Sequence, residues 1–228
     1  MQSSNNEKLS KTSGAIDASG GSHFDVIALA ASADGIKAIT EIISSLPADF
    51  PASILVVQHM SPHVESNLAR ILSQHTSLKV KEAEDGERFT RGTIYTARRD
   101  KHLMVNPDGT LSLATLDKVQ FTRPAADVLF VTMATSYKDR AIAVILTGAG
   151  QDGAIGSLVI KRLGGKVIVQ EDPNVPSMPE AAIRIDDVDF IKPLAEIAPI
   201  ITNLVTKGES PDHAHPSMNV ILKPVENV

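Results

Sequence analysis

The chain has 228 residues, 43% of them hydrophobic, which is enough to form one sizeable α/β domain. It contains no cysteine, and this excludes disulfides, thiolate metal ligands and a cysteine nucleophile. Its 22 basic and 27 acidic residues are mixed along the chain, giving a formal net charge of -5, so no basic block indicates nucleic-acid binding. No apolar stretch is long enough to cross a bilayer. We expect a cytoplasmic protein without membrane insertion.

Polar segments are expected at both ends of the chain. Residues 1–22 are rich in Ser, Asn, Gly and Lys, lack the apolar core of a signal peptide, and are predicted to form a flexible tail. Residues 206–228 form a second predicted tail, whose short apolar patch at 220–222 has no firm assignment. The folded domain is therefore expected to span residues 23–205, and nothing in the sequence demands more than a monomer.

Within this domain, continuous apolar runs alternate with segments of helical periodicity. The first part predicts a strand at 25–31, a helix at 35–46, a strand at 53–58 and a helix at 63–75. Short alternating runs separated by Asp-Gly and Arg-Gly signals then predict an inserted β-hairpin region at about 79–116.

The last part of the domain returns to the alternating pattern. Helices are expected at 125–138, 152–163, 178–185 and 193–205, and strands at 141–148, 166–170 and near 188–191. Strands that alternate with helices predict an α/β fold with a doubly wound, mostly parallel sheet and helices on both faces.

Three polar positions follow directly after predicted buried strands. Ser32 follows the first strand, His59 follows the second, and the loop 147–153 with Asp152 follows the strand at 141–148. Ligands of open α/β sheets gather at the carboxyl ends of the strands, so these side chains meet if the three strands are neighbours. A serine, a base and an orienting carboxylate are the groups needed for nucleophilic catalysis by a hydroxyl.

Each of these residues taken alone also has an ordinary structural interpretation. Ser32 is a typical helix N-cap, His59 a satisfied polar residue, and Asp152 a cap at the start of a helix. The glycines of the loop 147–153 would equally suit a phosphate at a helix N-terminus, although the Lys-Ser/Thr of a P-loop is missing. The coincidence of three suitable residues at equivalent strand ends favours the catalytic interpretation.

These residues lie in motifs that resemble those of the CheB-type chemotaxis methylesterases, over roughly residues 25–205. AASADG at 30–35 is similar to the family's GASTGG-like turn, and QHMSPH at 58–63 is similar to its QHMP-like segment. TGAGQDG at 147–153 is similar to the TGMGxDG-like loop. Further matches lie at 97–105, 123–130 and 170–183.

The resemblance implies the role of each residue and the reaction. Ser32 would be the nucleophile, His59 the general base and Asp152 the orienting carboxylate. The implied activity is hydrolysis of γ-glutamyl methyl esters on the cytoplasmic domains of methyl-accepting chemoreceptors, which in the family extends to deamidation of receptor glutamines. The mechanism needs neither a cofactor nor a metal. The backbone N–H groups of Ala33, Ala149 and Gly150 are the candidate donors to an oxyanion.

Four positions depart from the family pattern. Ala30, Ala33 and Asp34 replace residues of the glycine- and threonine-containing turn, and Ala149 stands where methionine is usual. Because Asp34 adds a negative charge near the oxyanion, one alternative is a receptor-docking or scaffold module of the same fold with weak catalysis. A nucleotide-binding protein that uses the loop 147–153 is a second alternative.

Two further expectations concern regulation and the basic residues. Full-length family members usually carry an N-terminal receiver domain, whereas only about 22 polar residues precede the domain here, so we expect either an excised fragment or a stand-alone esterase, without control by phosphorylation in cis. Arg98, Arg99, Lys101 and His102 fall in the hairpin region and are expected to be solvated. The alternative for these four residues is a basic rim that faces acidic receptor helices.

Overall fold

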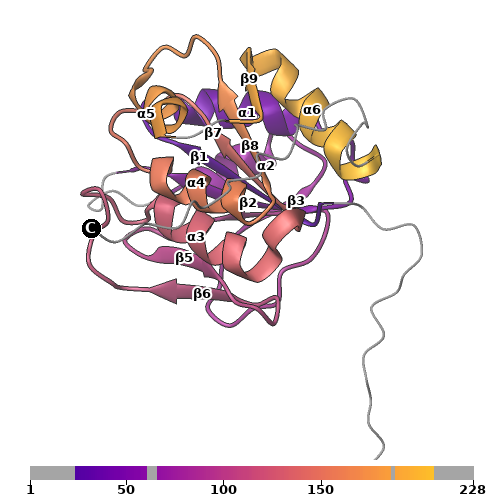
Figure 1. Ribbon diagram of the computed structural model, residues 1–228. Helices are drawn as coiled ribbons and strands as arrows, with labels where there is room; N and C mark the ends of the chain where they lie inside the picture. Colours follow the sequence, from indigo (N-terminus) through magenta and orange to yellow (C-terminus); the bar gives the residue numbers. More distant parts are fainter. Residues whose placement is uncertain (1–23, 61–65, 186–187, 208–228) are drawn as a thin grey trace, which may run out of the picture.

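The computed structural model describes residues 24–60, 66–185 and 188–207. A single seven-stranded sheet runs through the middle of the molecule, with a separate pair of strands beside it (Figure 1). The strands are β1 (Val26–Ala31), β2 (Ser53–Gln58), β3 (Lys79–Glu82), β4 (Thr93–Thr96), β5 (His102–Val105), β6 (Leu111–Ala114), β7 (Ala141–Ile145), β8 (Lys166–Gln170) and β9 (Phe190–Lys192). The α-helices are α1 (Gly35–Ser44), α2 (Leu68–Ser73), α3 (Ala126–Tyr137), α4 (Ala154–Arg162), α5 (Ser177–Ile185) and α6 (Leu194–Lys207).

The sheet is parallel throughout and is wound in two directions from β1. Its strand order is β3-β4-β2-β1-β7-β8-β9, and every neighbouring pair is parallel. The chain first moves outward from β1 through β2, then returns to place β7 on the other side of β1. The predicted doubly wound α/β fold is therefore confirmed. The winding direction changes at β1, which is where such sheets bind their ligands.

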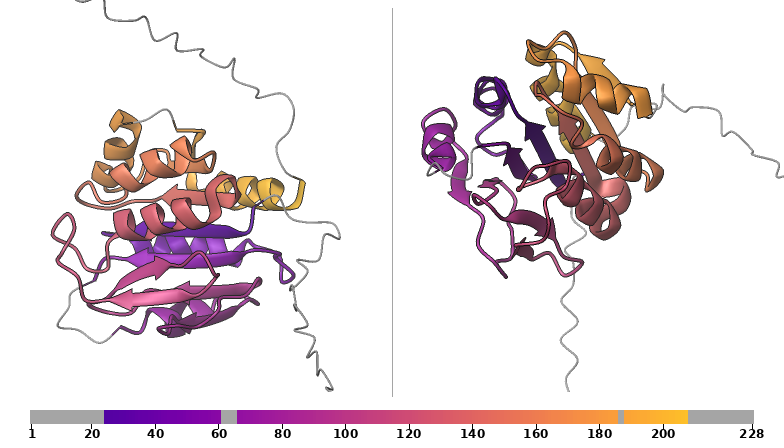
Figure 2. Two further views of the ribbon diagram at one scale, coloured as in Figure 1. Left: turned by 60° about the horizontal axis from the view of Figure 1, so that its bottom comes forward. Right: turned by 90° about the vertical axis from the view of Figure 1, so that its left-hand side faces the viewer.

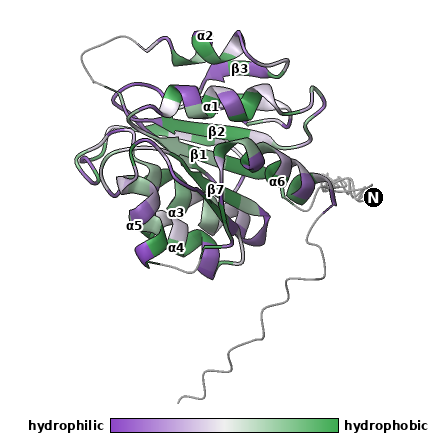
Figure 3. Ribbon diagram, turned by 90° about the horizontal axis from the view of Figure 1, so that it is seen from above, coloured by the Kyte–Doolittle hydropathy of each residue, from purple (hydrophilic) through white to green (hydrophobic). Residues whose placement is uncertain are grey.

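Alternate residues of the central strands face two separate cores. Ile27 and Leu29 of β1 pack with the apolar faces of α1, α2 and α6. Val26 and Ala28 face the opposite side, where α3, α4, α5 and the β5–β6 pair cover the sheet. Figures 2 and 3 show these two layers, with the hydrophobic central strands between them. Burial on both faces explains why the strands read as continuous apolar runs rather than as alternating patterns.

The expected hairpin region at 79–116 divides into two parts. Strands β3 and β4 join the main parallel sheet, and Ile94 of β4 lies in register with Ile54 of β2. Only β5 and β6 form an antiparallel pair. Short alternating runs predict that a segment is a strand, but not which strand it pairs with. Here β4 is buried against both cores, and this places it in the main sheet.

Several predicted boundaries also differ from the structure. The helix expected at 63–75 begins at Leu68, with residues 61–65 outside the described residues. Of the two expected tails, 1–22 and 208–228 lie outside the described residues, whereas Thr206 and Lys207 extend α6. In the part of the chain that the structure describes, no helix combines the length and apolar character needed to span a membrane.

Candidate active site

The ends of β1, β2 and β7 bring the three predicted site residues to one edge of the sheet. Ser32 follows β1, and its N–H donates to the Thr147 carbonyl beyond β7 at 3.0 Å. His59 follows β2, and its N–H donates to the Ala31 carbonyl at 3.0 Å. Backbone hydrogen bonds across neighbouring parallel strands therefore fix the positions from which the Ser32 and His59 side chains project.

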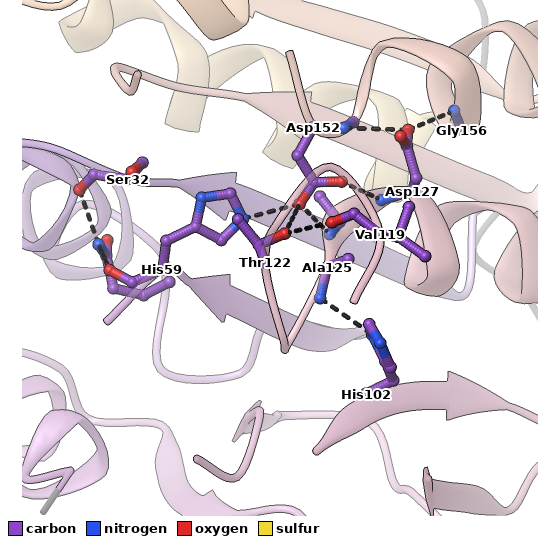
Figure 4. Close-up of polar contacts among 12 residues, drawn as sticks. Ser32, His59, His102, Val119, Thr122, Ala125, Asp127, Asp152 and Gly156 are labelled. Atoms are coloured by element: carbon purple, nitrogen blue, oxygen red, sulfur yellow. Dashed lines mark hydrogen bonds and ion pairs between the residues drawn. The ribbon is translucent and has the colours of Figure 1, made fainter. Parts of the chain in front are cut away.

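The carboxylate of Asp152 pairs with the His59 ring and with the start of helix α3. His59 Nε2 lies 2.7 Å from Asp152 Oδ2. The same carboxylate accepts hydrogen bonds from the N–H groups of Ala126 at 2.6 Å and Asp127 at 2.9 Å, and Asp152 is only 1% exposed (Figure 4). A helix N-terminus favours a negative charge, so α3 stabilises the carboxylate that orients the histidine.

The hydrogen bond to Asp152 also determines which His59 nitrogen is free to act as a base. A carboxylate only accepts, so Nε2 carries the proton and Nδ1 has a free lone pair in the neutral ring. Figure 4 shows the ring between Ser32 and Asp152. Among the described residues, the Ser32 hydroxyl has no hydrogen-bond partner, so no bond yet joins it to His59. Such bonds commonly tighten only when substrate is bound.

A glutamine, which the sequence analysis did not assign to the site, connects the backbones of Ser32 and His59. Gln58 Nε2 donates to the Ser32 carbonyl at 2.7 Å and to the His59 carbonyl at 3.0 Å. Gln58 is the last residue of β2 and is buried. Its position inside the QHMSPH motif was the only sequence signal for this role.

The turn after β1 accommodates the residues that depart from the family pattern. Asp34 has a φ of 61°, a left-handed conformation that suits glycine and that aspartate adopts more readily than most residues. Its carboxylate accepts a hydrogen bond from Asn174 Nδ2 at 3.2 Å. Ala30 lies within β1, paired with Val57 and Ile145, so an alanine fits there without strain.

Gly148 is required by the close approach of two segments at the site. A Cβ atom on Gly148 would lie 2.4 Å from Met178 Sδ and 2.8 Å from Ser32 Cβ. Any side chain at this position would push against Ser32. The sequence analysis gave Gly148 no steric role, because such a requirement appears only when the two segments are placed in space.

The three predicted oxyanion donors lie at the exposed side of the site. The backbone N–H groups of Ala33, Ala149 and Gly150 have no acceptor among the described residues. By contrast, the N–H of Ser32 donates to Thr147, and that of Gly148 donates to the Val175 carbonyl at 2.9 Å. The first three groups are therefore free of a protein acceptor, unlike the N–H groups of Ser32 and Gly148.

A second buried carboxylate occupies the N-terminus of helix α4. Asp127 Oδ1 accepts hydrogen bonds from the N–H groups of Gly153 at 3.0 Å and Gly156 at 2.7 Å. Burial raises the pKa of Asp127 to about 6, with the Asp152 charge adding to the rise and the Gly156 N–H opposing it. These N–H groups are thus not available to a phosphate, which argues against a nucleotide site in the loop 147–153. Within the described ranges, no cluster of three or more His, Asp or Glu side chains is placed to hold a metal ion.

One of the basic residues expected to be solvated is instead in the core. His102 is fully buried, and its Nδ1 accepts a hydrogen bond from the Ala125 N–H at 3.2 Å. Its Nε2 lies 3.0 Å from the Asp117 carbonyl and donates to it. Arg98 and Arg99 are exposed, as expected. His102 is the first residue of β5, a strand that packs against α3. Its burial was not predictable from its charge alone.

Comparisons with known proteins agree with the resemblance seen in the sequence. A family model described as CheB methylesterase matches residues 27–201. A putative protein-glutamate methylesterase/protein-glutamine glutaminase of Leptospira interrogans is 38% identical over 185 residues, covering 80% of this chain and 95% of that protein. The protein-glutamate methylesterase FrzG of Myxococcus xanthus is 37% identical over 76% of this chain and 53% of its own length.

A solved structure shows the same fold. The CheB methylesterase catalytic domain of Thermotoga maritima superposes with a TM-score of 0.77 at 37% sequence identity, covering 80% of this chain and 99% of that domain. The chain spans nearly the whole of the Leptospira relative but about half of FrzG. Fold, sequence motifs and family model coincide over the same residues, and the chain is an enzyme that belongs to the CheB methylesterase family.

Proposed function

We propose that this protein is a serine esterase that hydrolyses γ-glutamyl methyl esters on the cytoplasmic domains of chemoreceptors. The observation that carries the proposal is the His59–Asp152 pair at 2.7 Å, next to Ser32 and at the point where the winding of the sheet reverses. Membership of the CheB methylesterase family supports the substrate class, since relatives are named protein-glutamate methylesterases.

The geometry leads to an acyl-transfer mechanism. His59 Nδ1 takes the proton of the Ser32 hydroxyl as the Ser32 oxygen attacks the ester carbonyl, and the resulting imidazolium is stabilised by Asp152. The tetrahedral intermediate collapses to a glutamyl–Ser32 ester, and methanol leaves with the proton from His59. Water, activated by the same histidine, then hydrolyses this ester to release glutamate and restore Ser32. A glutamine substrate would follow the same steps with ammonia as the leaving group.

The negative charge of the intermediate needs hydrogen-bond donors that are in place beforehand. The free N–H groups of Ala33, Ala149 and Gly150 are the proposed donors, and one such donor contributes about 3 kcal/mol to transition-state stabilisation in serine hydrolases. They are on the exposed side of the nucleophile turn, where an incoming ester carbonyl would lie.

The experiment that tests this proposal measures methanol release from a methylated chemoreceptor cytoplasmic fragment. Ser32→Ala is expected to lower kcat by about 10⁴- to 10⁶-fold, because the nucleophile is lost. Ser45→Ala is the matched control, since Ser45 is exposed and lies at the far end of α1. Normal turnover by Ser32→Ala would refute the mechanism.

The same assay also decides between the esterase and the docking-module alternative. A wild-type protein that binds the fragment without releasing methanol would favour a scaffold of the same fold. A wild-type protein that releases methanol only while Ser32 is present would exclude that alternative.

A further inference from the structure

The loop after β6 ends in a tight turn that carries an exposed phenylalanine. Val119 and Thr122 exchange backbone hydrogen bonds of 3.2 and 2.9 Å, which leaves Gln120 and Phe121 at the tip. Both tip residues have positive φ values, 48° and 64°. Two-residue turns of this kind normally contain glycine or asparagine, since other residues are strained in this conformation.

Burial of the Phe121 side chain does not offset this backbone strain. Phe121 is 94% exposed, compared with 55% for Leu116, the next most exposed large apolar residue among those described. An apolar ring of this size in water is unfavourable by itself. A strained turn that holds an aromatic ring in solvent is therefore explained better by a partner than by folding.

The turn lies directly beside the catalytic residues. Phe121 and Thr122 line a small pocket of about 90 Å³ together with His59 and Met60. The Thr122 hydroxyl lies 2.8 Å from the Val119 carbonyl and 3.3 Å from Asp152 Oδ2, and its single proton can serve one of them at a time. The exposed ring is thus connected to the triad through one intervening residue.

Buried His102 fixes both ends of this loop. Its two ring nitrogens hold the Asp117 carbonyl and the Ala125 N–H, the residues that flank the loop on either side. Since His102 is fully buried, the loop is held in place by the core rather than by solvent-exposed contacts. The position of Phe121 relative to His59 is therefore set in advance of binding.

The surroundings of Phe121 carry a small excess of positive charge. Lys118 and Arg123 line the same pocket, and Arg123 pairs with Asp100 at 2.7 Å. Lys118 is exposed and forms no ion pair with any described residue, while Asp117 is its acidic neighbour in the sequence. Within the part of the chain that the structure describes, two cationic side chains and no acidic one therefore line this pocket. Because each turnover of the proposed reaction produces a glutamate, a substrate with several modified sites grows more acidic and more complementary to this surface.

We propose that the turn 119–122 is a docking element for the substrate helix, with Phe121 inserting between apolar side chains of an acidic, amphipathic helix that carries the methyl ester. This inference rests on the proposed function. On a helix, side chains three or four residues apart lie on the same face, so one face of a substrate helix can offer both an apolar contact to Phe121 and an ester to the neighbouring catalytic residues. Phe121 would thereby determine which helices reach the nucleophile.

The test is binding, measured in a Ser32→Ala background so that it does not depend on catalysis. A methylated chemoreceptor cytoplasmic fragment is titrated against Ser32→Ala alone and with Phe121→Ala, Phe121→Tyr or Ile185→Ala added. Phe121→Ala is expected to weaken binding by about 10- to 100-fold, as for an aromatic residue at the centre of an interface. Phe121→Tyr keeps the ring and should retain binding. Ile185, an exposed apolar residue at the end of α5, is the matched control and should leave binding unchanged.

Kinetics with Ser32 present separate docking from support of the triad. In the Phe121→Ala variant, kcat/KM for the fragment should fall about 10- to 100-fold relative to kcat/KM for a small glutamate γ-methyl ester, with the loss mainly in KM. Equal losses on both substrates, or unchanged binding in the Phe121→Ala titration, would overturn the docking role. If binding depends on Phe121 but the wild type releases no methanol, the docking inference stands and the proposed activity fails.

Discussion

The helices at the site begin in two different ways. Helices α3 and α4 each start on a buried carboxylate: Asp152 accepts hydrogen bonds from the first turn of α3, and Asp127 of that turn accepts them from the start of α4. Helix α1, which follows Ser32, starts at an exposed Asp34 whose side chain makes no capping hydrogen bond.

This difference separates the fixed side of the candidate site, at α3 and α4, from its open side, at α1. On the α3–α4 side, each carboxylate is matched by N–H groups, so the orientation of Asp152 and hence of His59 is determined by the fold. On the α1 side, Ala33 is exposed and its N–H group has no acceptor among the described residues. An oxyanion needs unoccupied donors, whereas an orienting carboxylate needs occupied ones.

The largest effect is expected from Asp152→Asn, which removes the charge from the fixed side. The two oxygens of Asp152 accept hydrogen bonds from the His59 ring and from two N–H groups of α3. Asparagine has only one side-chain oxygen, so its NH₂ group would face at least one of these donors. We expect kcat to fall by about 10⁴-fold, the loss found when a triad aspartate is replaced in this way. Methanol release measures it, with Asp49→Asn, an exposed aspartate distant from the site, as the control. A loss below tenfold would show that Asp152 is a cap and not part of a triad.

Gly148→Ala tests whether the two sides must touch. The added methyl group would overlap Met178 Sδ and Ser32 Cβ, and overpacking of this kind costs about 1–3 kcal/mol of stability. We expect kcat to fall by about 10²- to 10³-fold, because the nucleophile is displaced. Gly86→Ala is the control for loss of a glycine away from Ser32: a Cβ there meets no atom within 4 Å, although its φ of 76° makes the variant less stable through backbone strain. Wild-type turnover by Gly148→Ala would mean that the Ser32 turn is free to shift.

Asp127→Asn tests the carboxylate that caps α4, through the pH dependence of stability. The pKa of Asp127 is raised to about 6 by burial, above the unfolded value of 3.8, so the folded protein binds this proton more tightly than the unfolded chain does. The resulting stability is present below about pH 4 and is lost as the pH rises through about 6. Relative to Asp127→Asn, the wild type should lose up to about 3 kcal/mol of unfolding free energy over this range.

Urea unfolding of the two proteins at several pH values between about 4 and 7 measures this difference. Asp127→Ala provides a second comparison: it leaves the N–H groups of Gly153 and Gly156 without an acceptor and should be destabilised by about 1–3 kcal/mol at every pH. Parallel curves for wild type and Asp127→Asn would contradict the raised pKa.

Much of the fold was predictable from the sequence because the central strands are buried on both faces. The runs at 25–31, 53–58 and 141–148 correspond to β1, β2 and β7, and their parallel pairing follows from the helices between them. The pairing of β3 and β4 was not predictable, since short alternating runs fit either a hairpin or a sheet edge. The start of α2 was likewise misplaced, because helical periodicity carries no sharp boundary without a cap.

For the site, the sequence predicted the residues that follow strands but not those that support them. Ser32, His59 and Asp152 were identified by their equivalent positions at strand ends, and their roles remain a proposal. Asp127 was hidden inside an amphipathic helix pattern, and His102 among exposed basic residues. Their partners are backbone N–H and carbonyl groups distant in sequence, which no residue pattern encodes.

The smallest effect is expected on the open side, at Asp34. Its negative charge lies two residues from Ser32 and forms no ion pair with any described residue, so we expect it to oppose the developing oxyanion across solvent. Asp34→Asn keeps a residue tolerant of positive φ and should raise kcat about two- to fivefold at low salt, with the gain shrinking as salt screens the charge. Asp34→Gly should raise kcat equally while changing the free energy of unfolding by less than about 1 kcal/mol, because relief of the backbone is offset by greater freedom of the unfolded chain. A gain in Asp34→Gly alone would assign the effect to backbone strain, and a loss in both variants would show that the carboxylate takes part in binding substrate.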